Sequence, residues 1–471
     1  MNSQEMAELE RATGLIWDIA QRLGIDPFPV HFDVVPASIM YEFGAYGLPG
    51  RFSHWTHGRA YQQIKTMYDY GLSKIYELVI NANPSYAFLL ENNSVLQNKL
   101  VVAHVLGHSD FFKHNAYFAP TSRQMLETVS VHAERLRQYE FEHGPQAVEE
   151  FLDAVLSIQE HIDPYPDMRR KEHAPPDKPH RPPETAYDDL FYLGDDKRPE
   201  PVPVSKKNPP EPEKDLLLFL AANARELEDW QRDAIHIVHD EQLYFVPQMQ
   251  TKIMNEGWAA YWHLRILREL DLTQDEYMEF AELHANVLAP SKRSINPYYV
   301  GLKVWEDIER RWDEPTAEER DKLGRRGGEG KAKIFDVRAQ ENDTSFIRNY
   351  LTKDLVEELD LYLYKQENGK WVIVEKNWEK IRDMLVRSMT NFGQPYIVVE
   401  DGDYNRNHEL FLRHCYEGQD LDMDYAERTL RYVYRLWNRP VHLETIMDEK
   451  QVVLTYDGER ARTKVGEAVK S

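Results

Sequence analysis

The chain has 471 residues, enough for two or three domains with cores of their own, and its 42% hydrophobic residues exclude wholesale disorder. Its 57 Lys and Arg against 80 Asp and Glu give a formal net charge of −23, which disfavours nucleic acid or an anionic membrane as the main partner. The single cysteine, Cys415, excludes an intrachain disulfide and fits a reducing compartment. With no leader-like N-terminus and no apolar run long enough to span a membrane, we expect a cytoplasmic protein.

The segment before residue 164 has the apolar periodicity of helices. Apolar residues recur at helical spacing in five stretches, residues 5–23, 60–81, 95–115, 123–143 and 146–162. Residues 28–57, by contrast, are irregular, aromatic and interrupted by glycine and proline. We therefore predict a helical domain over residues 1–163 that contains an aromatic loop at residues 28–57.

A proline-rich segment follows this domain. Of the 26 prolines, 13 lie between Pro164 and Pro212, and proline lacks the amide hydrogen that helices and sheets need. We predict a linker or extended loop over residues 164–213. Helical patterns resume in residues 214–244, 247–270 and 298–312. These helices are expected to complete the N-terminal body over residues 214–313.

The C-terminal part has a different pattern. Residues 314–333 are charged and contain several glycines, which predicts a flexible segment. Helical and strand-like patterns then alternate, at residues 351–364, 371–374, 378–390 and 396–399. Asp401-Gly402 indicates the turn of a hairpin whose second strand is residues 409–414. We predict a mainly α protein with a smaller α+β domain over residues 334–471.

Two histidines have the spacing of metal ligands. His104 and His108 lie four residues apart in a helical pattern, so both imidazoles are expected on one face of a helix. Helices present two nitrogens to zinc in this way. The pair alone is weak evidence, because 18 histidines in one chain produce such spacings by chance.

A second segment adds a carboxylate to this pair. Glu256 and His263 lie seven residues apart in Asn-Glu-Gly-Trp-Ala-Ala-Tyr-Trp-His, again on one helix face. This context resembles zinc peptidases of the gluzincin type, in which a glutamate from a later helix completes a two-histidine helix. The resemblance implies a divalent metal, zinc in the first place, held by His104, His108 and Glu256, with His263 as a fourth ligand or a residue behind them. The alternative is that the aromatic residues pack in the core and Glu256 is a paired buried carboxylate.

The general base of those peptidases is missing. They have His-Glu-x-x-His, and the position of that glutamate is Val105 in this chain. Four carboxylates are candidates to replace it, namely Glu91, Asp110, Glu134 and Glu241, and Glu134 and Glu241 are taken as the predicted catalytic residues. If none acts on water, the site is structural, or redox-active with iron.

The aromatic loop contains polar residues of its own. Among its glycines lie four polar residues, Glu42, Arg51, His54 and His57. We predict that they line a substrate cleft, in which Arg51 binds an anionic group of the substrate and His54 or His57 lies near the metal. The alternative is an irregular core loop in which polar side chains satisfy buried backbone groups.

Several longer motifs carry a wider resemblance. Residues 41–55 read Tyr-Glu-Phe-Gly-Ala-Tyr-Gly-Leu-Pro-Gly-Arg-Phe-Ser-His-Trp, and residues 103–113 read Ala-His-Val-Leu-Gly-His-Ser-Asp-Phe-Phe-Lys. Further motifs occupy residues 70–80, 230–233, 244–248, 251–263 and 296–298. Together they are similar to the SpoVR family, the stage V sporulation protein R group, from about residue 10 to the C-terminus.

The resemblance implies a cytoplasmic bacterial protein needed for the spore cortex, a modified peptidoglycan layer, although relatives also occur in bacteria that form no spores. Two hypotheses follow. In the first, a metal-activated water attacks an amide or ester in a peptidoglycan-related substrate or a regulatory protein. In the second, the chain is a non-catalytic scaffold or regulator whose C-terminal domain binds a protein partner.

Overall fold

The structure is a computed structural model, and it describes residues 1–69, 77–166, 207–289, 295–367 and 370–468. The protein is mainly α-helical, which confirms the predicted fold class. It divides into two compact units. Unit 1 comprises Met1–Leu152 and Asp240–Gln394, and unit 2 comprises Asp153–His239 and Pro395–Ser471.

This division differs from the predicted domain boundaries. Residues 334–394, expected in the α+β domain, belong to unit 1, because Ile334, Phe346 and Ile381 are buried in its core. The segment 314–333 contains helix α13 (Ala317–Leu323), which begins with a capping box between Thr316 and Glu319. Most of the predicted linker, residues 164–213, lies outside the described residues.

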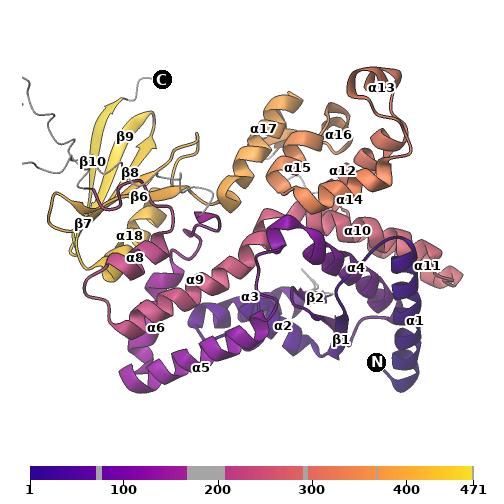
Figure 1. The fold of residues 1–471 in the computed structure, drawn as a ribbon, viewed down its shortest axis with the longest axis horizontal. Helices are drawn as coiled ribbons and strands as arrows, with labels where there is room; N and C mark the ends of the chain where they lie inside the picture. Colours follow the sequence, from indigo (N-terminus) through magenta and orange to yellow (C-terminus); the bar gives the residue numbers. More distant parts are fainter. Residues whose placement is uncertain (70–76, 167–206, 290–294, 368–369, 469–471) are drawn as a thin grey trace, which may run out of the picture. The chain divides into compact units, whose positions relative to one another are not determined.

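Unit 1 contains most of the helices (Figure 1). In chain order they are α1 (Ser3–Arg22), α2 (Ala37–Tyr46), α3 (Trp55–Asp69), α4 (Val95–His114), η1 (Ala116–Phe118), α5 (Met125–His143), the end of α9 (Asp229–Gln250), α10 (Lys252–Glu269), α11 (Gln274–Val287), α12 (Pro297–Asp313), α13, α14 (Gly330–Gln340), α15 (Asp343–Tyr350), α16 (Lys353–Glu358), α17 (Trp378–Met389) and η3 (Thr390–Gly393). Helix α6 (Pro145–Leu156) crosses the boundary between the units. Among the described residues, no helix combines the length and apolar character that crossing a membrane requires.

Two small sheets accompany these helices. Strands β1 (Val30–Val35), β3 (Ser85–Leu90) and β2 (Glu77–Ile80) form a sheet in the order β1-β3-β2, with β1 parallel and β2 antiparallel to β3. Strands β4 (Leu363–Glu367) and β5 (Lys370–Glu375) form a separate antiparallel pair.

Helix α4 lies at the centre of unit 1. It begins with a capping box between Ser94 and Gln97, and most of its side chains from Leu96 to Phe112 are buried on every face. Helices α1 and α10 pack against α4, and α12 packs against the other side of α10 (Figure 1). Because α4 is enclosed by other elements, its polar residues need partners inside the protein.

Glycines let the central helices approach at backbone distance. A Cβ on Gly107 of α4 would lie 2.8 Å from the Cα of Ala259 on α10. A Cβ on Gly257 of α10 would overlap the backbone of Gly301 on α12. Since Gly107 precedes His108 and Gly257 follows Glu256, these contacts set the positions of the candidate ligands.

Unit 2 is built around a five-stranded sheet. Its order is β10-β9-β8-β7-β6, formed by β6 (Ile397–Tyr404), β7 (Glu409–His414), β8 (Val441–Met447), β9 (Lys450–Tyr456) and β10 (Ala461–Ala468). Strands β7 and β8 are parallel and the other neighbours antiparallel. Helix α18 (Met423–Trp437) packs on β8 and β9, and α8 (Leu216–Asn223) packs on β6.

Several local predictions were wrong. The stretch 60–81 is not one helix, because α3 ends at Asp69 and residues 77–80 form β2. The loop at 28–57 contains β1 and α2, and residues 214–244 contain α8 and most of α9. The hairpin of β6 and β7 is present, but β6 runs through Asp401-Gly402 to Tyr404. Its turn instead uses Asn405, Arg406 and His408, which have positive φ.

Candidate metal centre

Three elements of unit 1 bring two imidazoles and two carboxylates together. His104 and His108 come from successive turns of α4, Glu256 from the start of α10, and Glu77 from the start of β2. Glu256 Oε2 lies 3.7 Å from His104 Nε2 and 3.4 Å from His108 Nε2. Glu77 Oε1 lies 3.3 Å and 3.7 Å from the same two nitrogens. Residues far apart in the sequence therefore meet in space.

The spacing of these atoms suits one small cation. Ligand atoms that each lie about 2.0–2.1 Å from a tetrahedral zinc are roughly 3.3 Å from one another. The four nitrogen–oxygen distances, between 3.3 and 3.7 Å, are close to that value. One possible ligand atom from each of Glu77, His104 and His108 lies within 4.8 Å of the other two.

The carboxylates themselves favour a positively charged ligand. Glu77 Oε2 and Glu256 Oε2 are buried, and neither accepts a hydrogen bond from any residue that the structure describes. Buried polar atoms in native proteins are nearly always hydrogen-bonded, so a buried carboxylate oxygen without a hydrogen-bond donor needs an explanation such as an ion. Glu256 Oε2 is also the oxygen that lies beside the two imidazole nitrogens, whereas Glu77 approaches them with its other oxygen, Oε1. Two buried carboxylate groups beside two imidazoles fit a metal site.

The other ring nitrogen of each histidine is engaged by the protein. His108 Nδ1 lies 2.9 Å from Asn255 Oδ1, an acceptor, so a neutral His108 would carry its proton on Nδ1 and its lone pair on Nε2. His104 Nδ1 lies 2.8 Å from His263 Nδ1, and His263 Nε2 lies 3.1 Å from His284 Nδ1 on α11. Partners of this kind fix the tautomer and orientation of metal-binding histidines.

The charges of the cluster depend on one another. Burial alone would lower the pKa of His108. The contacts with Glu256 and Glu77 outweigh burial and raise the pKa of His108 to about 10. Burial acts to raise the pKa of Glu256, whereas the contacts with His104 and His108 hold it well below its ordinary value. Burial, with His104 and His284 nearby, holds the pKa of His263 well below its ordinary value. Positive charge is therefore stabilised beside the carboxylates, while His263 stays neutral.

Tyr298, at the start of α12, lies against the same cluster. Its ring stacks on His104 with centroids 5.9 Å apart and an interplanar angle of 28°. Burial raises the pKa of the Tyr298 hydroxyl, and the charges of Glu256 and Glu77 raise it further. The phenol therefore stays protonated and can donate a hydrogen bond.

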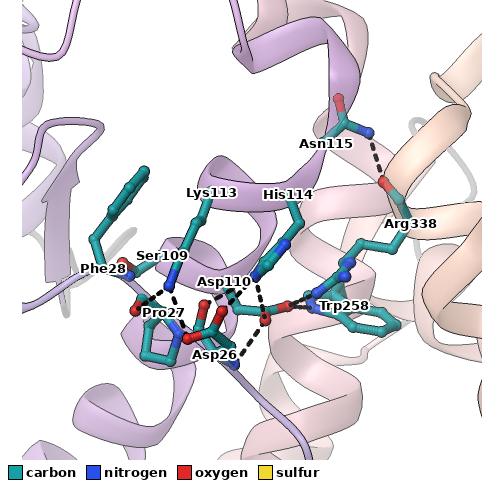
Figure 2. A network of polar contacts seen from close by, with 10 residues as sticks. All are labelled: Asp26, Pro27, Phe28, Ser109, Asp110, Lys113, His114, Asn115, Trp258 and Arg338. Carbon is teal, nitrogen blue, oxygen red and sulfur yellow. Dashed lines mark hydrogen bonds and ion pairs between the residues drawn. The ribbon is translucent and has the colours of Figure 1, made fainter.

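A network beside His108 joins the surrounding elements (Figure 2). Asp110 is completely buried, and its Oδ2 accepts hydrogen bonds from Trp258 Nε1 at 2.9 Å and Arg338 Nη1 at 2.7 Å. Its Oδ1 accepts from the backbone N–H of Asp26 at 2.9 Å. Both oxygens of this candidate base are thus committed to holding α4, α10, α14 and the segment before β1 together.

Comparison with known proteins places the chain in a family. A family model described as SpoVR like protein matches residues 3–394. The chain belongs to the SpoVR family. A second model, described as SpoVR-like C-terminal domain, matches residues 395–448, which begin where the C-terminal part of unit 2 begins. One of the three boundaries between the units of this SpoVR protein, that between residues 394 and 395, thus lies where the two family models meet, and the other two lie inside the first model.

A curated relative supports the same assignment. This SpoVR-family chain is 28% identical over 480 residues to a protein of Escherichia coli (strain K12) named Uncharacterized protein YcgB. The match covers 95% of this chain and 92% of the relative. No solved structure gives a significant match.

The predicted base Glu241 lies in a different polar cluster of this SpoVR protein. Its side chain is completely buried, with Oε2 at 2.6 Å from Arg51 Nε and Oε1 at 3.3 Å from His132 Nδ1. Arg51, which was expected to hold an anionic group of a substrate, therefore holds a carboxylate of the protein itself. The structure gives Glu241 two partners other than the residues of the candidate metal centre.

The other predicted site residues are placed as follows. Glu134 is 73% exposed on α5 and pairs with Arg137 at 3.0 Å. His57 is buried, and burial, followed by the charges of Arg51 and His54, lowers its pKa to about 4. Glu42 is exposed and lines, with Arg51, a cavity of about 380 Å³. A role of Glu42, Arg51, His54 and His57 in substrate binding stays a prediction.

Sequence reasoning missed four residues of the centre, namely Glu77, Asn255, His284 and Tyr298. Three of them lie inside motifs that carry the resemblance to the SpoVR family, at residues 70–80, 251–263 and 296–298. A search for polar residues within those motifs would have found them. No such motif contains His284.

Proposed function

We propose that this SpoVR-family protein binds one divalent metal ion, with zinc as the first expectation, between α4, α10 and β2. His104, His108 and Glu256 are the proposed ligands, and Asn255 and His263 orient the two imidazoles. The observation that carries the proposal is the meeting of Glu77 Oε1 and Glu256 Oε2 with the Nε2 atoms of His104 and His108 at distances of 3.3 to 3.7 Å, which is close to ligand spacing.

Glu77 gives the proposed centre a means of activating water. With three protein ligands, a tetrahedral metal keeps one position for water, and a carboxylate within hydrogen-bond reach serves as the base. Glu77 supplies this carboxylate in place of the glutamate that is missing at Val105. The proposed reaction is hydrolysis of an amide or ester, and the SpoVR family directs the search for a substrate to peptidoglycan and the spore cortex.

A second candidate function rests on the same four side chains. If Glu77 is a ligand, the metal has four protein ligands and no open position, which is typical of structural zinc. The protein would then act as a scaffold or regulator of cell-envelope assembly. X-ray absorption spectroscopy of the metal-bound protein with an added small thiol separates the two, because only the first leaves a position at which a metal–sulfur distance of about 2.3 Å can appear.

Metal content is the direct test of the proposed centre. We expect about one equivalent of divalent metal in the purified protein. The variants His108→Ala and Glu256→Gln should each bind less than about 0.2 equivalents, because each lacks one of the three proposed ligands. Inductively coupled plasma mass spectrometry measures both quantities. His236→Ala, which removes an exposed histidine of α9, is the matched control and should retain the metal. Unaltered protein with less than about 0.2 equivalents after growth with added zinc and iron would reject the centre.

Asn255 is expected to tune the affinity without supplying a ligand. Removing its amide from His108 Nδ1 should weaken metal binding by about 10- to 100-fold while one equivalent still binds at saturation. Competition with a chromophoric chelator measures the affinity of Asn255→Ala. Equal affinity in the variant and the unaltered protein would show that this hydrogen bond does not orient a ligand.

A further inference from the structure

A separate cleft of unit 1 lies at the N-terminal end of α10. It has a volume of about 590 Å³, within the range of about 300–1,000 Å³ that small-molecule sites occupy. Its walls come from the junction of α9 and α10, the first turn of α15 and the segment where α17 passes into η3. Its lining includes the apolar residues Ile253, Ile295 and Met389 and the hydroxyl-bearing residues Thr344, Ser388 and Thr390.

Two cations line this cleft in a protein of net charge −23. Lys252 and Arg348 are both exposed, and neither forms an ion pair with a residue that the structure describes. The carboxylate in the cleft, Asp343, accepts hydrogen bonds from the backbone N–H groups of Ile253 and Met254 at 2.8 and 2.9 Å. Asp343 thus caps α10. Burial raises the pKa of the Asp343 carboxyl group and the charge of Lys252 acts to lower it, but the Lys252 ammonium forms no ion pair with Asp343 and can still contact a ligand.

The backbone at one wall of the cleft is strained. Asn391 (φ 49°, ψ 40°) and Phe392 (φ 62°, ψ 21°) are consecutive left-handed residues, followed by Gly393 at φ 76°. A bulky residue such as Phe392 rarely adopts this conformation, at a cost of order 1 kcal/mol or more. Such strain concentrates at ligand-binding segments, and residues 391 and 392 are among those that line the cleft.

We propose that this cleft binds a small anionic ligand whose acid group is held by Lys252 and Arg348, with its polar groups on Thr344, Ser388 and Thr390. The acid group is a carboxylate or a phosphate, since both accept charge-assisted hydrogen bonds from lysine and arginine. Lys252 and Glu256 lie four residues apart on α10, so they project from one face of the helix. A ligand in the cleft would therefore have its acid group about one helical turn from the candidate metal centre, but its binding does not depend on a metal.

Calorimetric titration of the full chain at constant low ionic strength tests the proposal, with inorganic phosphate and succinate as the two probes. We expect saturable binding of at least one probe with a dissociation constant below about 5 mM. Lys252→Met and Arg348→Met should each weaken that binding at least about 10-fold, because each removes a charge-assisted contact. Lys322→Met, which removes an exposed lysine paired with Glu318 on α13, is the matched control and should bind as the unaltered chain does.

Each outcome decides part of the proposal. Tighter binding of phosphate indicates a phosphorylated ligand, and tighter binding of succinate a carboxylate. Ser388→Trp fills the cleft without removing a charge, and it should abolish binding even if a charge variant fails to fold. Binding should persist after treatment with a chelator, which distinguishes this proposal from that of the metal. Failure of both probes to saturate, or unchanged binding in both charge variants, would overturn it.

Discussion

Gly257→Ala is expected to lower the free energy of unfolding by about 3–4 kcal/mol, an unusually large loss for the addition of one methyl group. The added Cβ would overlap the backbone of Gly301, and α12 cannot move away without losing its packing on α10. Backbone atoms cannot change rotamer to make room, so the two helices must separate. Urea denaturation followed by circular dichroism measures the loss from the midpoint and slope.

Gly14→Ala is the matched control for this prediction. Gly14 is also inside a helix, but it is exposed on α1 and nothing lies within 4 Å of the position of its Cβ. Alanine has the higher helix propensity, so the control should gain about 0.5–1 kcal/mol. If both variants gained stability alike, the backbone contact between α10 and α12 would be wrong. Because Gly257 follows Glu256, its variant should also bind metal more weakly.

The histidine pair was accessible from sequence because its evidence is local. A spacing of four residues in an apolar helical pattern places His104 and His108 on one face whatever surrounds the helix. Glu256 was found from its aromatic neighbours and the resemblance to zinc peptidases. The expectation that Glu256 would lie beside His104 and His108 also came from that resemblance, because no local pattern connects residues about 150 positions apart.

Glu77 was missed because its local pattern is ambiguous. Strand β2 has only four residues, Glu-Leu-Val-Ile, and a run this short fits a helix as well as a strand. It was therefore taken as the end of the helix predicted over residues 60–81. Only pairing with β3, in which Glu77 lies opposite Leu89, defines the strand and turns the carboxylate toward α4.

The carboxylates that were candidates for the general base show that long-range contacts cannot be predicted from local sequence. Asp110 and Glu241 are acidic residues in helical patterns, and nothing nearby in sequence indicates that they are already paired. The partners are Arg338, 228 residues after Asp110, and Arg51, 190 residues before Glu241. Such long-range pairs determine whether a carboxylate is free to do chemistry, and composition and spacing do not contain them.

Asp110→Ala is expected to lower the free energy of unfolding by about 3–5 kcal/mol, because it leaves Arg338 as an uncompensated buried charge. The substitution also removes the acceptor of Trp258 Nε1 and of the Asp26 backbone N–H. Each buried donor that loses its partner costs about 1–3 kcal/mol. Arg338→Met should cost a similar amount, because the buried Asp110 carboxylate loses the cation that pairs with it and keeps only its hydrogen bonds from Trp258 and Asp26. Urea denaturation of both variants measures these losses.

The double variant distinguishes a coupled pair from two independent contacts. Once both charges are gone, neither is left buried alone, so the loss in the double variant should be smaller than the sum of the single losses by at least about 1 kcal/mol. Glu318→Ala breaks an exposed pair with Lys322 and should cost no more than about 0.5 kcal/mol. Strictly additive losses would mean that Asp110 and Arg338 act separately. Since Asp110 is two residues from His108 and Trp258 two from Glu256, coupling here would also mean that this network sets the separation of the proposed ligands.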